Sequence, residues 1–260
     1  MRISSVVALS WVVWSGAGAT EVRVLGKGAL DGVAVELTQV AEKLQVSLAS
    51  SPVQVFKLET TGWTNEQQEG LRKDQPLVCS VFELPGGASG CWMTFGLDDG
   101  VGGLRAVAVL LTRSSSTATW AVAREWVADS VALGDMGFKR EKQTFATDGG
   151  TLTRTLRSLS VEGVAHKLDC GCTACSSRSS DTEETDVYAW NAAAGKFEPA
   201  KHEKYYIAQS GENLMAAVRK ALGDARRVSH VAKLNPQILD GTIFKGGERV
   251  LVMRDAGPKP

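Results

Sequence analysis

The 260-residue sequence predicts an α+β protein, in which a β-rich antiparallel domain, a sandwich or a small barrel, is followed by a small βααβ domain. Three observations support this class. Apolar residues alternate, or form short runs between turn residues, through most of the chain. Apolar stripes at helical spacing are clear only after residue 210. A hydrophobic content of 43% with no net formal charge is ordinary for a globular protein.

The first 19 residues have the pattern of a secretory signal peptide. Met1-Arg2 supplies a positive start, residues 6–14 form a short apolar core, and Ala17-Gly18-Ala19 places small residues before a cleavage site. We therefore predict a signal peptide at 1–19 and export to the periplasm, cell wall or extracellular space. The apolar core is too short for a membrane span, and no later run of 18 apolar residues follows, so no transmembrane segment is expected.

Residues 20–199 predict one β-rich domain of unrecognised family. Val33, Val35 and Leu37 fall at alternate positions, and the pattern repeats at residues 44–48, although residues 36–44 could equally form a short helix. Three hairpins are expected from apolar arms joined by turn residues. Their arms are residues 104–112 with 119–127, the residues on either side of Asp148-Gly149-Gly150, and residues 187–190 with 196–198.

Polar and aromatic residues of this domain give weaker signals. The acidic stretch at residues 181–186 is most simply a solvated loop. Trp120 and Trp126 lie in a strand pattern and are expected in the core, whereas Trp63 and Trp92 lie beside turn residues and are expected to be more exposed. Residues 200–204 are expected to link this domain to the next.

The segment at 205–254 predicts a complete small domain, followed by a tail at 255–260. A short strand pattern at residues 205–209 leads to a turn in which Asn213 is a good N-cap. One apolar stripe then ends at Gly223, and a second, from Val228 to Leu234, ends at Asn235-Pro236. Residues 242–244 and 250–252 supply further extended residues, so two helices should pack on a two-stranded antiparallel ribbon.

These motifs resemble a lysin-motif (LysM) domain at about residues 204–253. The resemblance rests on the Tyr-x-Ile strand, on Gly211-Glu212-Asn213-Leu214, on the Leu-Asn-Pro corner and on the closing Val-Leu-Val, in order and at nearly the family's spacing. The chain departs from the family at the last turn, where the interval before Val250 is about one residue longer and Lys245 replaces a frequent proline.

The resemblance implies a glycan ligand. LysM domains bind N-acetylglucosamine polymers such as peptidoglycan and chitin in a shallow groove between two loops. It implies one lip at Gly211, Glu212, Asn213 and Leu214, and a second lip at Asn235, Pro236, Gln237 and Ile238. Backbone amides and short polar side chains suit hydroxyl and acetamido groups, and Leu214 and Ile238 could cover an apolar sugar face. Asn213 could equally serve as a helix cap, and Asn235 has a second interpretation as a cap of the corner.

The charge distribution fits an anionic wall polymer. Residues 205–255 contain eight Lys or Arg and five Asp or Glu, whereas residues 20–204 contain 19 basic and 24 acidic side chains. The asymmetry would help the terminal segment approach peptidoglycan, but it is too weak to indicate a nucleic acid. We expect an exported bacterial cell-envelope protein that tethers its β-rich domain at the wall, with no cofactor and with protein partners unknown.

Five cysteines fit an oxidising compartment. Cys79 and Cys91 flank a tight turn and could form a disulfide across a hairpin. Cys170, Cys172 and Cys175 would leave an odd thiol whichever two of them pair. With His166 they could alternatively bind zinc, but export favours a disulfide, so no metal site is predicted.

Two other functions are open. The stretch Ala88-Ser89-Gly90-Cys91-Trp92-Met93 is similar to the Ser-x-Gly-Cys motif of L,D-transpeptidases, so Cys91 could be the nucleophile of a wall-modifying enzyme. However, no histidine precedes His166, and Met93 stands where that family has an arginine. No catalytic residue is therefore predicted. In the other alternative, the protein is a structural or assembly protein without a glycan ligand.

Overall fold

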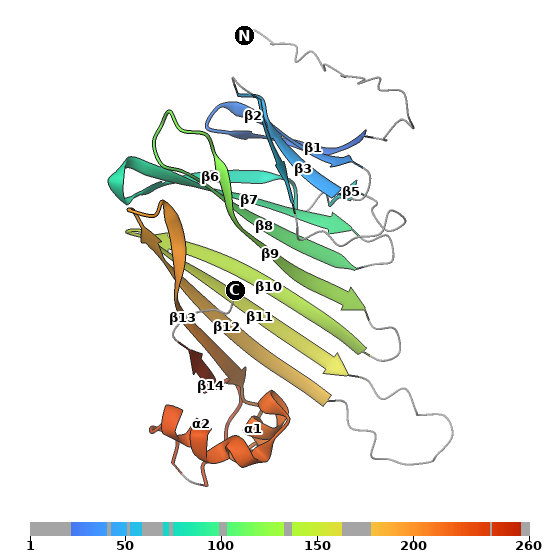
Figure 1. Cartoon of the computed structure of the whole chain (residues 1–260). Coiled ribbons are helices and arrows are strands. Elements are labelled where there is room, and N and C mark those ends of the chain that lie inside the picture. The colour runs from blue at the N-terminus through green and yellow to red at the C-terminus, as the bar shows by residue number, and fades with distance from the viewer. Residues whose placement is uncertain are drawn as a thin grey trace, which may run out of the picture.

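The computed structural model describes residues 22–40, 43–50, 53–58, 70–72, 75–98, 103–132, 137–162, 178–239 and 241–255. These residues form two antiparallel β-sheets and two short C-terminal helices (Figure 1). The prediction of a mostly antiparallel β protein with helices near its C-terminus is confirmed. Both sheets are open over the described residues, so the barrel alternative is wrong there. The predicted signal peptide and residues 256–260 of the predicted tail lie outside the described residues.

The N-terminal strands form a four-stranded sheet in the order β1-β2-β3-β4. The strands are β1 (Val22–Leu30), β2 (Val33–Val40), β3 (Lys43–Leu48) and β4 (Gln54–Lys57). Asp31 and Gly32 connect the first two with φ of 50° and 77°, as a tight hairpin turn requires. The alternating residues of β2 and β3 are strands as predicted, and the helix alternative for residues 36–44 is wrong.

The second sheet has ten strands in the order β14-β13-β12-β11-β10-β9-β8-β7-β5, with β6 also paired to β7 (Figure 1). Its members are β5 (Gly70–Leu71), β6 (Val78–Leu84), β7 (Ala88–Asp98), β8 (Leu104–Arg113), β9 (Ala121–Ala132), β10 (Gly137–Asp148), β11 (Thr151–Glu162), β12 (Arg178–Asn191), β13 (Lys196–Ile207) and β14 (Arg249–Asp255). The three predicted hairpins are confirmed as β8–β9, β10–β11 and β12–β13.

The small sheet packs on one end of the large sheet. Leu37, Leu44 and Val46 are fully buried in one cluster with residues of β7 and β8 such as Met93 and Val109. Side chains from both sheets therefore exclude water from this first core, which supplies the main hydrophobic stabilisation of the N-terminal part.

A second core forms where the large sheet folds over itself. Strands β9 and β10 pair only near Ser130 and Arg140, so beyond that point they separate. Trp126 of β9 there lies 5.9 Å from the Tyr188 ring of β12, and Trp92 of β7 lies 4.4 Å from Phe145 of β10, measured between ring centroids. We call this group, with Leu110 and Leu152, the aromatic core. Trp92 is half-buried against three aromatic rings, so it is more exposed than the buried Trp120 and Trp126, as predicted, but it packs on the aromatic core.

Strand β13 runs from this folded sheet directly into the C-terminal segment. Residues 200–204, predicted as a linker, lie within β13 and pair with β12. The acidic residues 181–186 lie in β12, so the prediction of a solvated loop is wrong. The acidic side chains pair instead with basic residues of neighbouring strands, as in Arg157 with Asp181 and Lys204 with Glu184.

The C-terminal segment has the βααβ order that its sequence predicts. Helix α1 (Leu214–Leu222), the 3-10 turn η3 (Ala225–Arg227) and helix α2 (Val228–Leu234) connect β13 to its antiparallel partner β14. The buried residues are Tyr206, Ala208, Ala217, Val218, Val231, Phe244, Val250 and Val252, which we call the terminal core. Gly223 ends α1 with φ of 72°, as predicted for a C-terminal glycine. No helix in the described ranges is long and apolar enough to cross a bilayer.

Candidate functional site

The first predicted lip is built on the start of helix α1. The side chain of Asn213 accepts a hydrogen bond from the backbone N–H of Ala216 at 2.9 Å, so the cap role is confirmed. Gly211 has φ of 84°, a conformation that favours glycine. Both residues are exposed and keep backbone groups near the surface.

Glu212, the third residue of this lip, points into the protein. Only 8% of its surface is exposed, and its carboxylate accepts hydrogen bonds from the Tyr206 hydroxyl at 3.0 Å and from the Gln209 N–H at 2.9 Å, beside an ion pair with Lys220. Burial raises the pKa of Glu212, but these partners outweigh it and hold the pKa below its ordinary value. The carboxylate therefore fixes the loop, and its oxygens are occupied.

Asn235 of the second lip is also internal. It is 1% exposed, and its amide donates to the carbonyls of Val231 and Leu251 at 2.7 and 2.8 Å. Its oxygen accepts from the Leu251 N–H at 2.9 Å. All of these groups are used inside the fold, which favours the interpretation of Asn235 as a cap of the corner.

The remaining lip residues reach the surface. Pro236 and Gln237 are exposed, whereas Leu214 and Ile238 are half-buried and pack against the terminal core. Sequence reasoning missed three exposed apolar side chains near them: Met215 (51% exposed), Leu239 (74%) and Ile243 (59%). The sequence could have indicated their exposure, because each of these apolar residues falls outside the periodic pattern of the core residues.

The backbone joins the two lips. Asn213 and Ile243 form an isolated antiparallel bridge, the N–H of Gly211 donates to the Phe244 carbonyl at 2.9 Å, and the N–H of Phe244 donates to the Glu212 carbonyl at 2.8 Å. The segment that leaves the second lip therefore returns to pair with the first lip. The exposed residues Gly211 and Asn213 thus lie beside Ile243, whose apolar side chain is also exposed.

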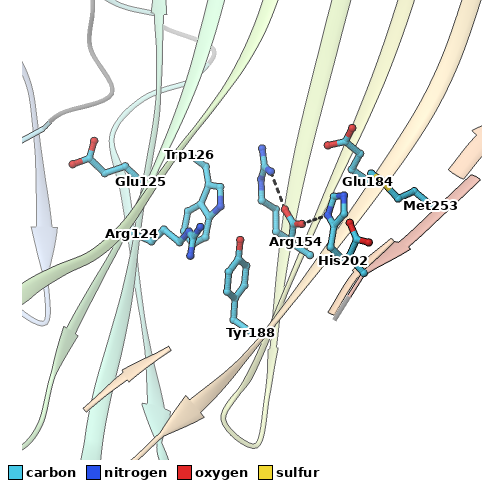
Figure 2. Close-up of a pocket in the computed structure, with 10 residues that line it drawn as sticks. Arg124, Glu125, Trp126, Arg154, Glu184, Tyr188, His202 and Met253 are labelled. Carbon is cyan, nitrogen blue, oxygen red and sulfur yellow. Dashed lines mark hydrogen bonds and ion pairs between the residues drawn. The ribbon is translucent and has the colours of Figure 1, made fainter. Parts of the chain in front are cut away.

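A separate pocket of about 330 Å³ lies on the folded sheet (Figure 2). Its lining comes from five strands and comprises Arg124, Glu125, Trp126, Arg154, Glu184, Asp186, Tyr188, His202, Met253 and Asp255. The sequence interpretation had placed Asp186 in a loop and His202 in a linker, so it could not bring them together. Only the strand register makes them neighbours.

The register explains where the pocket lies. Residues opposite one another in antiparallel strands point to the same face, which places Arg154, Asp186, His202 and Asp255 in one row across β11 to β14. On β12, Tyr188 lies two residues after Asp186 and belongs to the aromatic core. On β13, Tyr206 lies four residues after His202 and belongs to the terminal core. The pocket therefore occupies the part of this face between two packed cores.

A network of buried charged side chains lines the pocket. Asp186 accepts a hydrogen bond from Arg154 Nη1 at 3.1 Å and lies 2.6 Å from Nδ1 of His202 (Figure 2). The guanidinium of Arg124 lies 4.7 Å from the centroid of the Tyr188 ring and 5.8 Å from that of Trp126. Burial, followed by the charge of Asp186, raises the pKa of the Tyr188 hydroxyl, which stays protonated at neutral pH.

Cys91 lacks the properties of a nucleophile. Its side chain is 0% exposed, and a hydrogen bond with the Cys79 thiol, together with burial, raises its pKa. A reactive cysteine instead needs an accessible thiolate of lowered pKa. The same hydrogen bond lowers the pKa of Cys79, against the effect of burial.

Cys79 and Cys91 are free thiols, so the disulfide predicted between them is not formed. Cys79 lies opposite Met93, and Cys91 lies opposite Val81, which makes the two cysteines diagonal neighbours. Diagonal neighbours are about 7–8 Å apart, beyond the usual disulfide Cα separation of about 4.4–6.8 Å. The other candidates, Cys170, Cys172 and Cys175, lie with His166 outside the described residues. Within the ranges that are described, no three His, Cys, Asp or Glu side chains are grouped to hold a metal ion.

The chain matches no protein-family model, no curated protein and no solved structure.

Proposed function

We propose that the C-terminal βααβ segment is a LysM-like module that binds an N-acetylglucosamine glycan such as peptidoglycan. Binding would tether the β-rich part of an exported bacterial protein at the cell wall. The order of elements, the capping of α1 by Asn213 and the corner at Asn235 support this proposal.

One observation carries the proposal: the pairing of Asn213 with Ile243. It places the exposed residues Gly211 and Asn213 of the first lip next to an apolar side chain that is 59% exposed. Sugars are bound by this combination, because hydroxyl and acetamido groups need hydrogen-bond partners while the ring face needs apolar contact. Lip contacts from Gly211, Pro236 and Gln237 complete the proposed site, whereas Glu212 and Asn235 support it from inside.

The excess of basic residues in the segment supports an anionic polymer. A glycan held at the lips would also raise the concentration of the linked sheets near the wall, because the second encounter becomes intramolecular. We further propose that the protein is exported, because its first 19 residues have the pattern of a signal peptide.

The test is co-sedimentation of the chain from Thr20 to Pro260 with purified sacculi, in parallel with chitin. The variants Ile243→Ser and Gln237→Ala should each reduce the bound fraction several-fold while far-UV circular dichroism stays unchanged. Val55→Ser is the matched control, since Val55 is a strand valine that is 52% exposed in the other sheet. Failure of the unaltered chain to sediment with either polymer would refute the proposal and favour an assembly role.

A further inference from the structure

The pocket between the aromatic core and the terminal core has polar groups that the protein itself leaves unused. Arg154 is 9% exposed, and its buried Nε has no hydrogen-bond partner among the described residues. A buried donor without a partner costs about 1–3 kcal/mol, so its retention needs a reason. An acceptor that enters the pocket would supply one.

Arg124 supplies a second cation to the lining of the pocket. Arg124 lies over the rings of Tyr188 and Trp126, and no carboxylate in the described part of the chain forms an ion pair with it. The aromatic faces hold its guanidinium in place without neutralising it. Both arginines line the pocket; Figure 2 shows Arg124 beside Trp126 and Tyr188, Arg154 on the side of His202, and Glu125 pointing away from both. A carboxylate suits two such guanidinium groups.

The other side of the pocket is acidic. Asp255 lies across from His202 on β14, and its carboxylate has no ion pair within the ranges that are described. Glu184 lines the pocket together with Met253 and forms an ion pair with Lys204. Among the described residues, no other carboxylate pairs with this lysine. Asp255 therefore offers the free negative charge at this end. The Arg154 guanidinium reaches over to Asp186 on β12, which leaves about two strand spacings, or roughly 10 Å, to β14.

This arrangement excludes simpler ligands. Apart from Glu125, which points away, a bare anion would meet three carboxylates in the lining, against two arginines. A bare cation would leave the Nε of Arg154 and the guanidinium of Arg124 without an acceptor. A molecule with a negative group at one end and a positive group at the other satisfies both sides.

We propose that this pocket binds a small zwitterionic ligand, with a carboxylate directed at Arg124 and Arg154 and an ammonium directed at Asp255. This is the chemistry of an amino acid or of a short peptide with free termini. The volume of about 330 Å³ is near the lower end for small-molecule sites, which fits a ligand of one or two residues. The pocket shares no residue with the lips of the terminal module, so the two proposals stand independently.

The test is isothermal titration calorimetry on the chain from Thr20 to Pro260 with three probes: alanyl-alanine, its N-acetylated form and its C-terminal amide. Alanyl-alanine should bind, and each blocked form should bind at least about tenfold more weakly, because each loses one charged contact. Equal binding of a blocked form, or no heat from alanyl-alanine at up to about 10 mM, would overturn the proposal.

Variants locate the site. Arg124→Met keeps an apolar stem on the aromatic rings but removes the charge, and Asp255→Asn removes the opposite charge; each should weaken alanyl-alanine binding at least about tenfold. Arg140→Met is the matched control, since Arg140 lies 4.9 Å over the Phe138 ring outside the pocket, and Glu198→Gln controls for the carboxylate. Unchanged affinity in both pocket variants, with folding verified by thermal unfolding, would place the binding elsewhere and refute the assignment.

Discussion

The side chain of Asn235 pairs with both backbone groups of Leu251, accepting from its N–H at 2.9 Å and donating to its carbonyl at 2.8 Å. Leu251 lies in the last strand of the large sheet, and Asn235 occupies the position that a further strand would take. The edge is therefore closed locally by one amide, which limits pairing with other chains.

Asn235→Ala should destabilise the protein by about 2–4 kcal/mol, because the N–H and carbonyl of Leu251 and the carbonyl of Val231 lose buried partners. Urea unfolding followed by circular dichroism would measure this change. Gln237→Ala is exposed and should change stability by less than about 0.5 kcal/mol. Equal midpoints for the two variants would contradict the internal role of Asn235.

The buried pair of Arg154 with Asp186 should be far more sensitive than the exposed pair of Arg157 with Asp181 between the same two strands. Asp186→Ala leaves a buried cation without its partner and should cost about 3–5 kcal/mol. Asp181→Ala breaks a pair whose arginine side chain is 59% exposed and should cost less than about 1 kcal/mol. Chemical denaturation of both variants decides the question, and similar losses would count against the contrast.

Acid should weaken the terminal module through Glu212. Its folded-state pKa is below the ordinary value, so its stabilisation is present above the unfolded pKa of about 4.3 and is lost as pH falls through the lower folded pKa. Unfolding free energies measured from pH 6 to pH 3 should therefore fall less steeply in Glu212→Gln. Glu203, whose pKa is also lowered despite burial, should contribute separately, so Glu203→Gln is the parallel variant. Slopes identical to that of the unaltered chain would contradict this.

Alkylation should distinguish Cys79 from Cys91. Iodoacetamide should modify Cys79 first in the native protein, because this thiol is partly exposed and has the lower pKa, while Cys91 should react only after unfolding. Peptide mapping by mass spectrometry resolves the two sites. Rapid native modification of Cys91 would revive the enzyme interpretation that its burial argues against.

Local patterns predicted the local structure well. Gly223, Asn213 and the corner before Pro236 mark helix ends through short-range hydrogen bonding and dihedral preference, so the sequence shows them directly. Turns such as Asp148-Gly149-Gly150 likewise identify their hairpins. These features depend on residues only a few positions apart.

The charged strands could not be read in the same way. Residues 181–186 and 200–204 have no apolar alternation, because their partners are side chains of opposite charge rather than a hydrophobic layer. Arg154 lies 32 positions from Asp186, and Arg249 lies 66 positions from Glu183, so the sequence does not show that the charges meet. The pocket depends on these pairings and was missed for the same reason.

Strand β13 belongs to both the folded sheet and the terminal module, so no hinge separates them. If the module binds a wall polymer, the long sheet must project from that polymer in one fixed orientation and cannot rotate relative to the module. Mechanical tension between the polymer and the N-terminal end would pass along β13 and load its hydrogen bonds with β12 in shear, where many bonds resist together.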